Sequence, residues 1–139
     1  MSETKTTTNT PTVWPALTYK DAEAALRFLT EAFGFEETLV VRGEEGDGRA
    51  IHHAEMKWPS GGGIMFGSPR PRGDENEIFP EGPVSIYVVC DDPDGLLERA
   101  TKAGAEIVLP IKDEDYGSRG FTARDPEGNL WSFGTYRGA

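Results

Sequence analysis

Apolar and polar positions alternate along this chain in an order that occurs twice. The first half predicts a strand over 13–19, a helix over 21–33 and further strands over 36–42, 50–58 and 62–68. The second half predicts a strand over 84–90, a helix over 93–103 and strands over 106–111, 120–124 and 129–136. Each helix begins at an aspartate cap and ends beside a glycine. The pattern predicts an α+β protein of two βαβββ modules, with curved mixed sheets that enclose a groove and helices on the outer faces.

Sequence similarity between the halves supports this division. Pro59 aligns with Pro126 and Phe66 with Phe133, so both pairs lie 67 residues apart. The strand and helix that start near Pro15 also correspond to those that start near Ile86. Two motifs in the same order favour an internal duplication over chance. We therefore expect a disordered N-terminus over 1–12, a first module over 13–68, a linker over 69–83 and a second module over 84–139.

The composition narrows the choice of partners. The chain has 139 residues, with 24 acidic against 14 basic ones, and a formal net charge of -10. Phosphates would be repelled, which argues against nucleic acid or an anionic membrane as a partner, whereas a cationic or neutral small molecule is permitted. The single cysteine, Cys90, lies in an apolar strand and is expected to be a core residue rather than a nucleophile. With no disulfide and no signal or membrane segment, the sequence predicts a cytoplasmic protein.

The alternation of side chains along a strand predicts which residues face the groove. The continuous apolar set, which includes Ile86, Val88, Trp131 and Phe133, is expected to face the helices. The opposite faces then carry a mixture of aromatic, small and hydroxyl side chains: Trp14, Ala16, Met65, Ser85, Tyr87, Ser132 and Tyr136. Such a mixture suits a flat, partly polar ligand. The large side chains would also suit a core in which they pack on one another, but the small residues favour an open groove.

Three segments of the chain resemble the vicinal oxygen chelate superfamily, which comprises glyoxalases, bleomycin-resistance proteins and dioxygenases. They are 20–35, 89–106 and 116–131, and the run Asp125-Pro126-Glu127-Gly128-Asn129-Leu130-Trp131 is the most specific of them. The resemblance covers residues 13–136. It implies the paired-module fold and a homodimer.

The enzymes of that superfamily hold a divalent metal with His or Glu at four equivalent points. Transferred to this sequence, the points fall on Trp14, Met65, Ser85 and Ser132. Met suits only soft metals, and neutral Ser is a poor donor. The resemblance thus implies that the metal centre is absent, and we expect no metal and no other cofactor.

The two histidines are not expected to form another metal centre. His52 and His53 are neighbours on a strand, so they are expected to point to opposite faces and cannot chelate one ion together. His53 and Glu55 share a face and form at most half of a site. No catalytic residue is assigned.

The resemblance is closest to the branch that binds drugs without a metal. It implies a homodimer that binds a small aromatic or polycyclic ligand, such as an antibiotic, and confers resistance by sequestration. Besides the groove residues, we expect Trp58, Phe79, Tyr116 and His53 near the ligand. Arg119 would either reach a ligand carbonyl or carboxylate, or pair on the surface with Asp113 or Asp115.

Two other functions remain open. One is an enzyme of the glyoxalase or dioxygenase type, a lyase, isomerase or dioxygenase, which depends on a metal or has a relocated site at His53 and Glu55. The other is an interaction module whose groove is filled by its own side chains.

Overall fold

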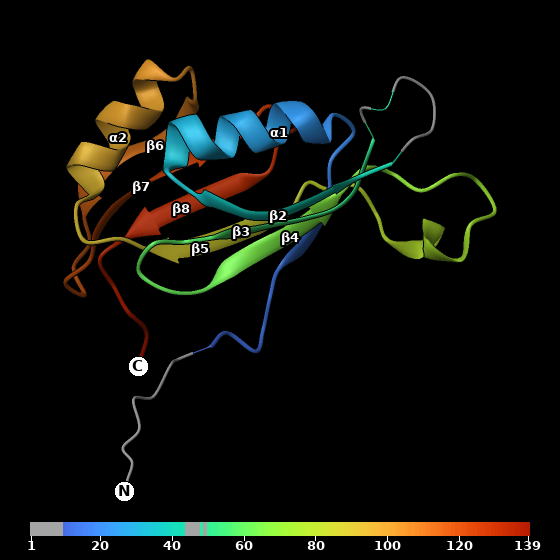
Figure 1. Ribbon diagram of the computed structural model, residues 1–139. Helices are drawn as coiled ribbons and strands as arrows, with labels where there is room; N and C mark the ends of the chain where they lie inside the picture. The colour runs from blue at the N-terminus through green and yellow to red at the C-terminus, as the bar shows by residue number, and fades with distance from the viewer. Residues whose placement is uncertain (1–9, 44–47, 49) are drawn as a thin grey trace, which may run out of the picture.

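The computed structural model describes residues 10–43, 48 and 50–139. Most of the N-terminal segment predicted to be disordered, and most of the turn between the second and third strands, lie outside this range. The first repeat consists of β1 (Ala16–Thr18), α1 (Ala22–Phe28), the π-helical turn η1 (Leu29–Phe33), β2 (Glu36–Arg42), β3 (Ile51–Lys57) and β4 (Gly63–Gly67). A short 3-10 turn, η2 (Glu75–Ile78), interrupts the predicted linker. The second repeat consists of β5 (Ser85–Val89), α2 (Pro93–Lys102), β6 (Glu106–Asp113), β7 (Arg119–Arg124) and β8 (Leu130–Gly134) (Figure 1).

The two repeats form two four-stranded mixed sheets with the same topology, which confirms the α+β fold class. The strand orders are β1-β4-β3-β2 and β5-β8-β7-β6. One outer pair is parallel in each sheet, β1 with β4 and β5 with β8, with Leu17 opposite Phe66 in the first and Val88 opposite Phe133 in the second. The repeat in the sequence is therefore also a repeat of strand register.

Three strands differ from the prediction by two or three residues at one end, since β1 and β8 are shorter and β6 extends to Asp113. Pro15 has no N–H to donate to the ladder, so β1 begins only at Ala16, and Trp14 precedes the sheet. Tyr136 likewise lies beyond the end of β8 at Gly134. The predicted helix caps are present, since Asp21 accepts a hydrogen bond from Ala24 N and Asp92 accepts one from Gly95 N.

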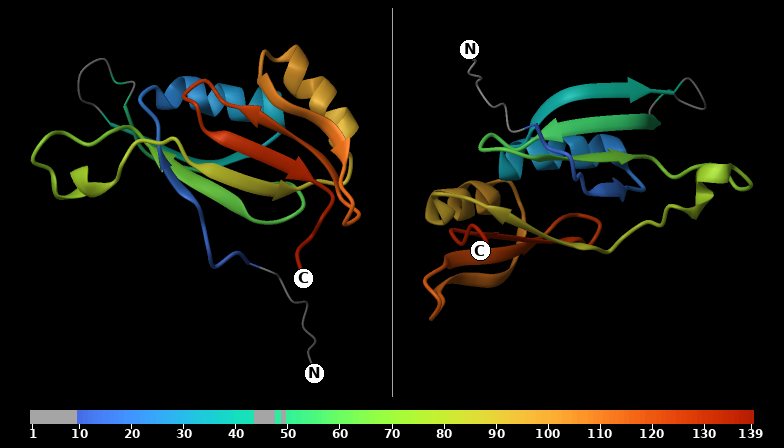
Figure 2. Two further views of the ribbon diagram at one scale, coloured as in Figure 1. Left: turned by 180° about the vertical axis from the view of Figure 1, so that it is seen from behind. Right: turned by 90° about the horizontal axis from the view of Figure 1, so that it is seen from below.

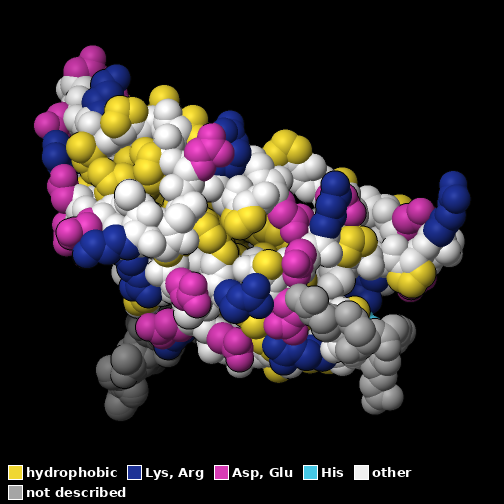
Figure 3. Space-filling view, turned by 90° about the horizontal axis from the view of Figure 1, so that it is seen from above, with side chains coloured by type: hydrophobic (Ala, Val, Ile, Leu, Met, Phe, Trp, Pro, Cys, Tyr) yellow, Lys and Arg dark blue, Asp and Glu magenta, His cyan; other side chains and the backbone are white. Residues whose placement is uncertain are grey.

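The sheets lie side by side, with the β1 edge of one facing the β5 edge of the other (Figure 2). The helices cover one face of the pair (Figure 1). On that side of the molecule, acidic and basic side chains are interspersed (Figure 3). The opposite face of each sheet is open, so the two sheets of one chain do not close around a shared groove. None of the described helices is long and apolar enough to cross a membrane.

The core lies between helices and sheets and is shared by the two repeats. The side chains predicted to face the helices are buried there, among them Ile64, Phe66, Trp131 and Phe133. Phe33 of η1 packs on rings of the second sheet, with centroids 5.6 Å from Trp131 and 4.7 Å from Phe133. Neither repeat therefore has a complete core of its own.

A buried carboxylate, Asp125, joins the two repeats. Asp125 is only 4% exposed. Oδ2 accepts hydrogen bonds from Tyr19 Oη of the first repeat at 2.6 Å, from Asn129 Nδ2 at 2.9 Å and from Trp131 Nε1 at 3.1 Å. Oδ1 accepts from the backbone N–H groups of Glu127 and Asn129. Burial and the Asp125 charge raise the pKa of the Tyr19 phenol, so it remains a donor.

Neighbours of Asp125 in the Asp-Pro-Glu-Gly-Asn run extend this joint. The Glu127 carboxylate accepts from the backbone N–H groups of Lys20 at 2.7 Å and Asp21 at 2.8 Å, at the start of α1. Asn129 Oδ1 accepts from Val84 N at 2.9 Å, just before β5. The most specific motif of the sequence thus has a structural role, which is to hold the repeats together.

We predict that Asp125→Asn destabilises the fold by about 3 kcal/mol, because an amide cannot accept all five of these hydrogen bonds and buried donors lose their partner. Urea unfolding followed by circular dichroism measures the change. The exposed Asp115→Asn is the matched control and is expected to change stability by less than about 0.5 kcal/mol. Equal stabilities of the two variants would contradict this account of the joint.

Candidate functional site

Each sheet carries a separate cavity on its open face. The first-sheet cavity has a volume of about 240 Å³ and lies over β1, β3, β4 and the linker. The second-sheet cavity has a volume of about 340 Å³ and lies over β6, β7 and β8 beside Tyr87 of β5. Seven of the twelve residues predicted to bind the ligand are divided between these two half-sites. The other five line neither cavity: Trp14, Trp58, Ser85, Arg119 and Tyr136.

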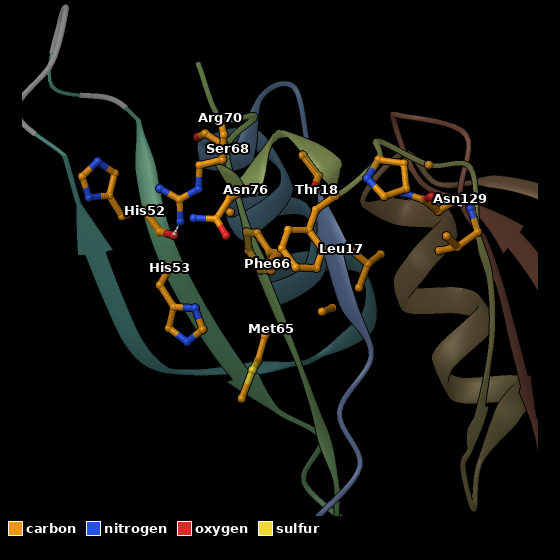
Figure 4. A pocket seen from close by; sticks show the side chains of 16 residues that line it. Leu17, Thr18, His52, His53, Met65, Phe66, Ser68, Arg70, Asn76 and Asn129 are labelled. Atoms are coloured by element: carbon orange, nitrogen blue, oxygen red, sulfur yellow. Dashed lines mark hydrogen bonds between the residues drawn. The ribbon is translucent and has the colours of Figure 1, made fainter. Parts of the chain in front are cut away.

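The first-sheet cavity contains four of the predicted ligand-binding residues: Ala16, His53, Met65 and Phe79. Ala16 and Met65 are register partners on β1 and β4. Phe79 follows η2 and is 59% exposed, so the linker forms part of this site. Figure 4 shows Met65 and His53 toward one end of the cavity, and Arg70, Ser68 and Asn76 toward the other.

The histidines differ in their surroundings. Strand pairing shifts by one residue between Val41 and Arg42, so His52 lies at a bulge of β3. The rings of His52 and His53 diverge (Figure 4). His53 Nε2 lies 2.8 Å from Glu55 Oε2, so the pair that shares a face is in hydrogen-bond contact.

The second-sheet cavity is lined by aromatic rings and hydroxyls. Tyr87 donates a hydrogen bond from its hydroxyl to the Tyr136 carbonyl at 2.6 Å, and the ring of Tyr116 packs edge-on against Tyr136 at 5.6 Å. Ser132 Oγ lies 2.8 Å from Thr122 Oγ1 at the base of the cavity. A side chain at Gly134 would collide with the Tyr87 hydroxyl, so glycine lets this ring lie across β8.

Comparison with known proteins decides the family. The profile of the Glyoxalase/Bleomycin resistance protein/Dioxygenase superfamily matches residues 12–133. The chain belongs to this superfamily. It is 33% identical over 129 residues to an uncharacterized protein of Mycobacterium tuberculosis strain H37Rv. The aligned region covers 89% of this chain and 74% of that protein.

Solved structures of the superfamily have the same fold. TioX from Micromonospora sp. ML1 is 31% identical and superposes with a TM-score of 0.70 over 86% of this chain and 93% of its own. The fosfomycin resistance protein FosX from Mesorhizobium loti, at 14% identity and a TM-score of 0.61, covers 91% of this chain and 92% of its own. The latter likeness concerns the fold alone.

The metal points of the superfamily do not fit a divalent ion in this chain. Trp14 packs on Gly63 and donates its indole N–H to Pro11 O at 3.3 Å. Met65 and Ser132 line different cavities, and Ser85 is exposed at the start of β5. Within the described part of the chain, no three His, Cys, Asp or Glu side chains gather as a metal site would require.

Two residues expected near a ligand have other partners. Trp58 donates its indole N–H to Val89 O at 2.9 Å and packs against Phe35, so it ties the first sheet to the second. It lines neither open-face cavity but a third one, of about 410 Å³, between β4 and β5. Arg119 donates to Asp94 at 2.9 Å and to Asp113 at 3.0 Å. These hydrogen bonds raise the pKa of Arg119. Of the two predicted roles, Arg119 thus has that of a surface ion pair, with Asp113 and also with Asp94.

Cys90 is a core residue, as the sequence indicates. Its side chain is buried on the helix side of β5. Burial, with a further contribution from Asp91 and Asp92, raises the pKa of the thiol to about 11. A thiol whose pKa is raised in this way is protonated at neutral pH, which makes it a poor nucleophile.

Sequence reasoning missed the part that the linker plays. Arg70 and Asn76 line the first-sheet cavity, although Phe79 was the one residue of their segment expected near a ligand. The available signal was a pair of arginines, Arg70 and Arg72, that each follow a proline in a chain with an acidic surplus.

Proposed function

We propose that the protein binds a small aromatic molecule of the natural-product or antibiotic kind without a metal, and confers resistance by sequestering it. The observation that carries this proposal is the aromatic rim of the second-sheet cavity. Tyr87 and Tyr116 line the cavity and are 49% and 64% exposed, and Tyr136, which contacts both of them, is 45% exposed. Neighbouring rings left this exposed on a folded surface are typical of a binding site.

The chemistry of this cavity suits a flat, partly polar ligand. Its rings can stack on an aromatic surface, each contributing on the order of 1 kcal/mol beyond burial. The hydroxyls of Thr122 and Ser132, and that of the buried Ser118, can fix the ligand's orientation. The reducing cytoplasm is the compartment that we propose for a protein with one buried thiol.

We further propose that a second copy of the chain covers the open faces. Leu39 and Val41 of β2 are each 44% exposed, and Leu109 of β6 is 58% exposed. Leu39 and Val41 pair with Glu55 and His53, which places them on the same open face as the first-sheet cavity. A homodimer that brings one first sheet over one second sheet would bury these side chains and combine two half-sites into one groove.

A second candidate function is an enzyme with a relocated site. The contact between His53 and Glu55 favours it, because a carboxylate in hydrogen-bond contact orients a histidine ring for proton transfer. Ser68 and Asn76 lie in the same cavity and could position a substrate.

Titration with a panel of polycyclic and glycopeptide antibiotics, followed by intrinsic fluorescence and calorimetry, tests the binding proposal. We expect at least one compound to bind, and Tyr116→Ala to weaken its binding about tenfold through loss of stacking. Ile78→Ala removes an exposed apolar side chain outside both cavities and should leave the affinity unchanged. Failure of the whole panel, or equal effects of the two variants, would count against the proposal.

Sedimentation equilibrium at micromolar concentration tests the dimer. We expect twice the chain mass of 15.2 kDa and a shift toward monomer in Leu109→Asp, since a carboxylate in the interface loses its hydration. A wild-type mass of a single chain would contradict the dimer.

Mass spectrometry of a bound compound recovered after incubation in D₂O separates the two candidate functions. The binding proposal predicts a recovered compound of unchanged mass. A mass change, or deuterium incorporation into carbon that is lost in His53→Gln, would establish the enzyme instead.

A further inference from the structure

The first-sheet cavity has an unusual charge for this protein. The chain carries 24 acidic residues and a net charge of -10, yet no Asp or Glu is among the described residues that line the cavity. Its one permanently charged side chain is Arg70. The cavity therefore offers a positive group inside an otherwise acidic molecule.

One hydrogen bond holds the Arg70 side chain in place and leaves other N–H groups of its guanidinium available. It lies three residues after the end of β4 and is half-buried. Its Nη2 donates to the backbone oxygen of His52 at 2.9 Å, at the bulge of β3. None of the ion pairs between described residues includes Arg70. Because a guanidinium has five N–H groups, most of them remain to meet a ligand.

Neutral hydrogen-bonding groups lie at the same end of the cavity as Arg70. Figure 4 shows Ser68 and Asn76 beside it. Ser68 Oγ accepts from Ile51 N at 2.9 Å, which leaves its own O–H free to donate. Asn76 N donates to Asp74 Oδ1 at 2.7 Å, and this contact fixes the turn that carries the Asn76 side chain.

Nearby carboxylates are occupied by other donors. Glu55, on the same face of the sheet, is in contact with His53 at 2.8 Å. Asp74 caps the 3-10 turn as described. The apolar part of the lining includes Leu17, Met65, Phe66 and Phe79, and the remaining polar side chains are neutral Thr18 and Asn129 and the two histidines. The cavity thus has its cationic group, Arg70, at one end and Met65 beside His53 at the other (Figure 4).

We propose that this cavity binds the carboxylate of an amphipathic organic acid, with Arg70 as its anchor and the apolar part of the acid over Met65 and Phe79. The planar fork of a guanidinium matches a carboxylate with two parallel hydrogen bonds. One fixed positive charge with two neutral neighbours balances one negative charge. The inference deepens the proposed function, on which it rests, by naming the ligand chemistry of one half-site.

Calorimetric titration with 2-naphthoate and its uncharged isostere 2-naphthamide tests the proposal. We expect the acid to bind the wild-type protein about tenfold more tightly than the amide. Arg70→Gln should abolish this preference, and Arg70→Lys should retain part of it. Arg72→Gln, which removes an exposed arginine two residues away, should keep the full preference.

Methionine methyl signals in ¹³C NMR locate the ligand in the same samples. The chain has three methionines. Met65 lines the cavity, whereas Met56 is fully buried on the helix side. We expect naphthoate to shift the Met65 signal and leave that of Met56 in place, and an unshifted Met56 signal in Arg70→Gln shows that this variant is folded.

The outcomes separate the inference from the proposed function. Equal binding of acid and amide, a preference that survives in Arg70→Gln, or no shift at Met65 would overturn the carboxylate site. If antibiotics bind but naphthoate does not, only the inference fails. If neither binds, both fail.

Discussion

The hydrogen bonds of one buried carboxylate are the constraint on which the rest of the structure depends. Asp125 receives donors from its own turn, from Trp131 in the adjacent strand and from Tyr19 in the other repeat. A buried anion is stable only when it is well hydrogen-bonded, so each donor must remain in place. This fixes the end of β1 against the start of β8, and thereby one repeat against the other.

The position of the cavities follows from this joint. With Phe33 of the first repeat packed on the rings of the second sheet, the shared core occupies the helix side of both sheets. The other faces are left without cover, and on them the strands expose tyrosines, hydroxyls and Met65 in place of metal ligands. The open faces therefore carry two cavities of different character. Tyr87 and Tyr116 line one of them, and Arg70 lines the other.

The sequence predicted the fold well because its signals are local. Alternation along the strands predicted that Trp131 and Phe133 face the helices, and the offset between Phe66 and Phe133 reappears as strand register. The site was harder to predict because partners far apart in sequence decide it. Arg119 meets Asp94, which lies 25 residues away, and Trp58 meets Val89, which lies 31 residues away. Periodicity cannot show such contacts, nor the folding of the linker that brings Arg70 to the first sheet.

The central proposal is that the open faces of the sheets bind organic molecules without a metal. The most direct test is to titrate the protein with a bound aromatic compound in the presence of EDTA, and again after addition of Zn²⁺, Mn²⁺, Ni²⁺ or Fe²⁺. The account predicts the same dissociation constant under all conditions, because none of the groups on the open faces needs a metal to bind the ligand. Binding that is lost in EDTA and restored by one of these ions would contradict it.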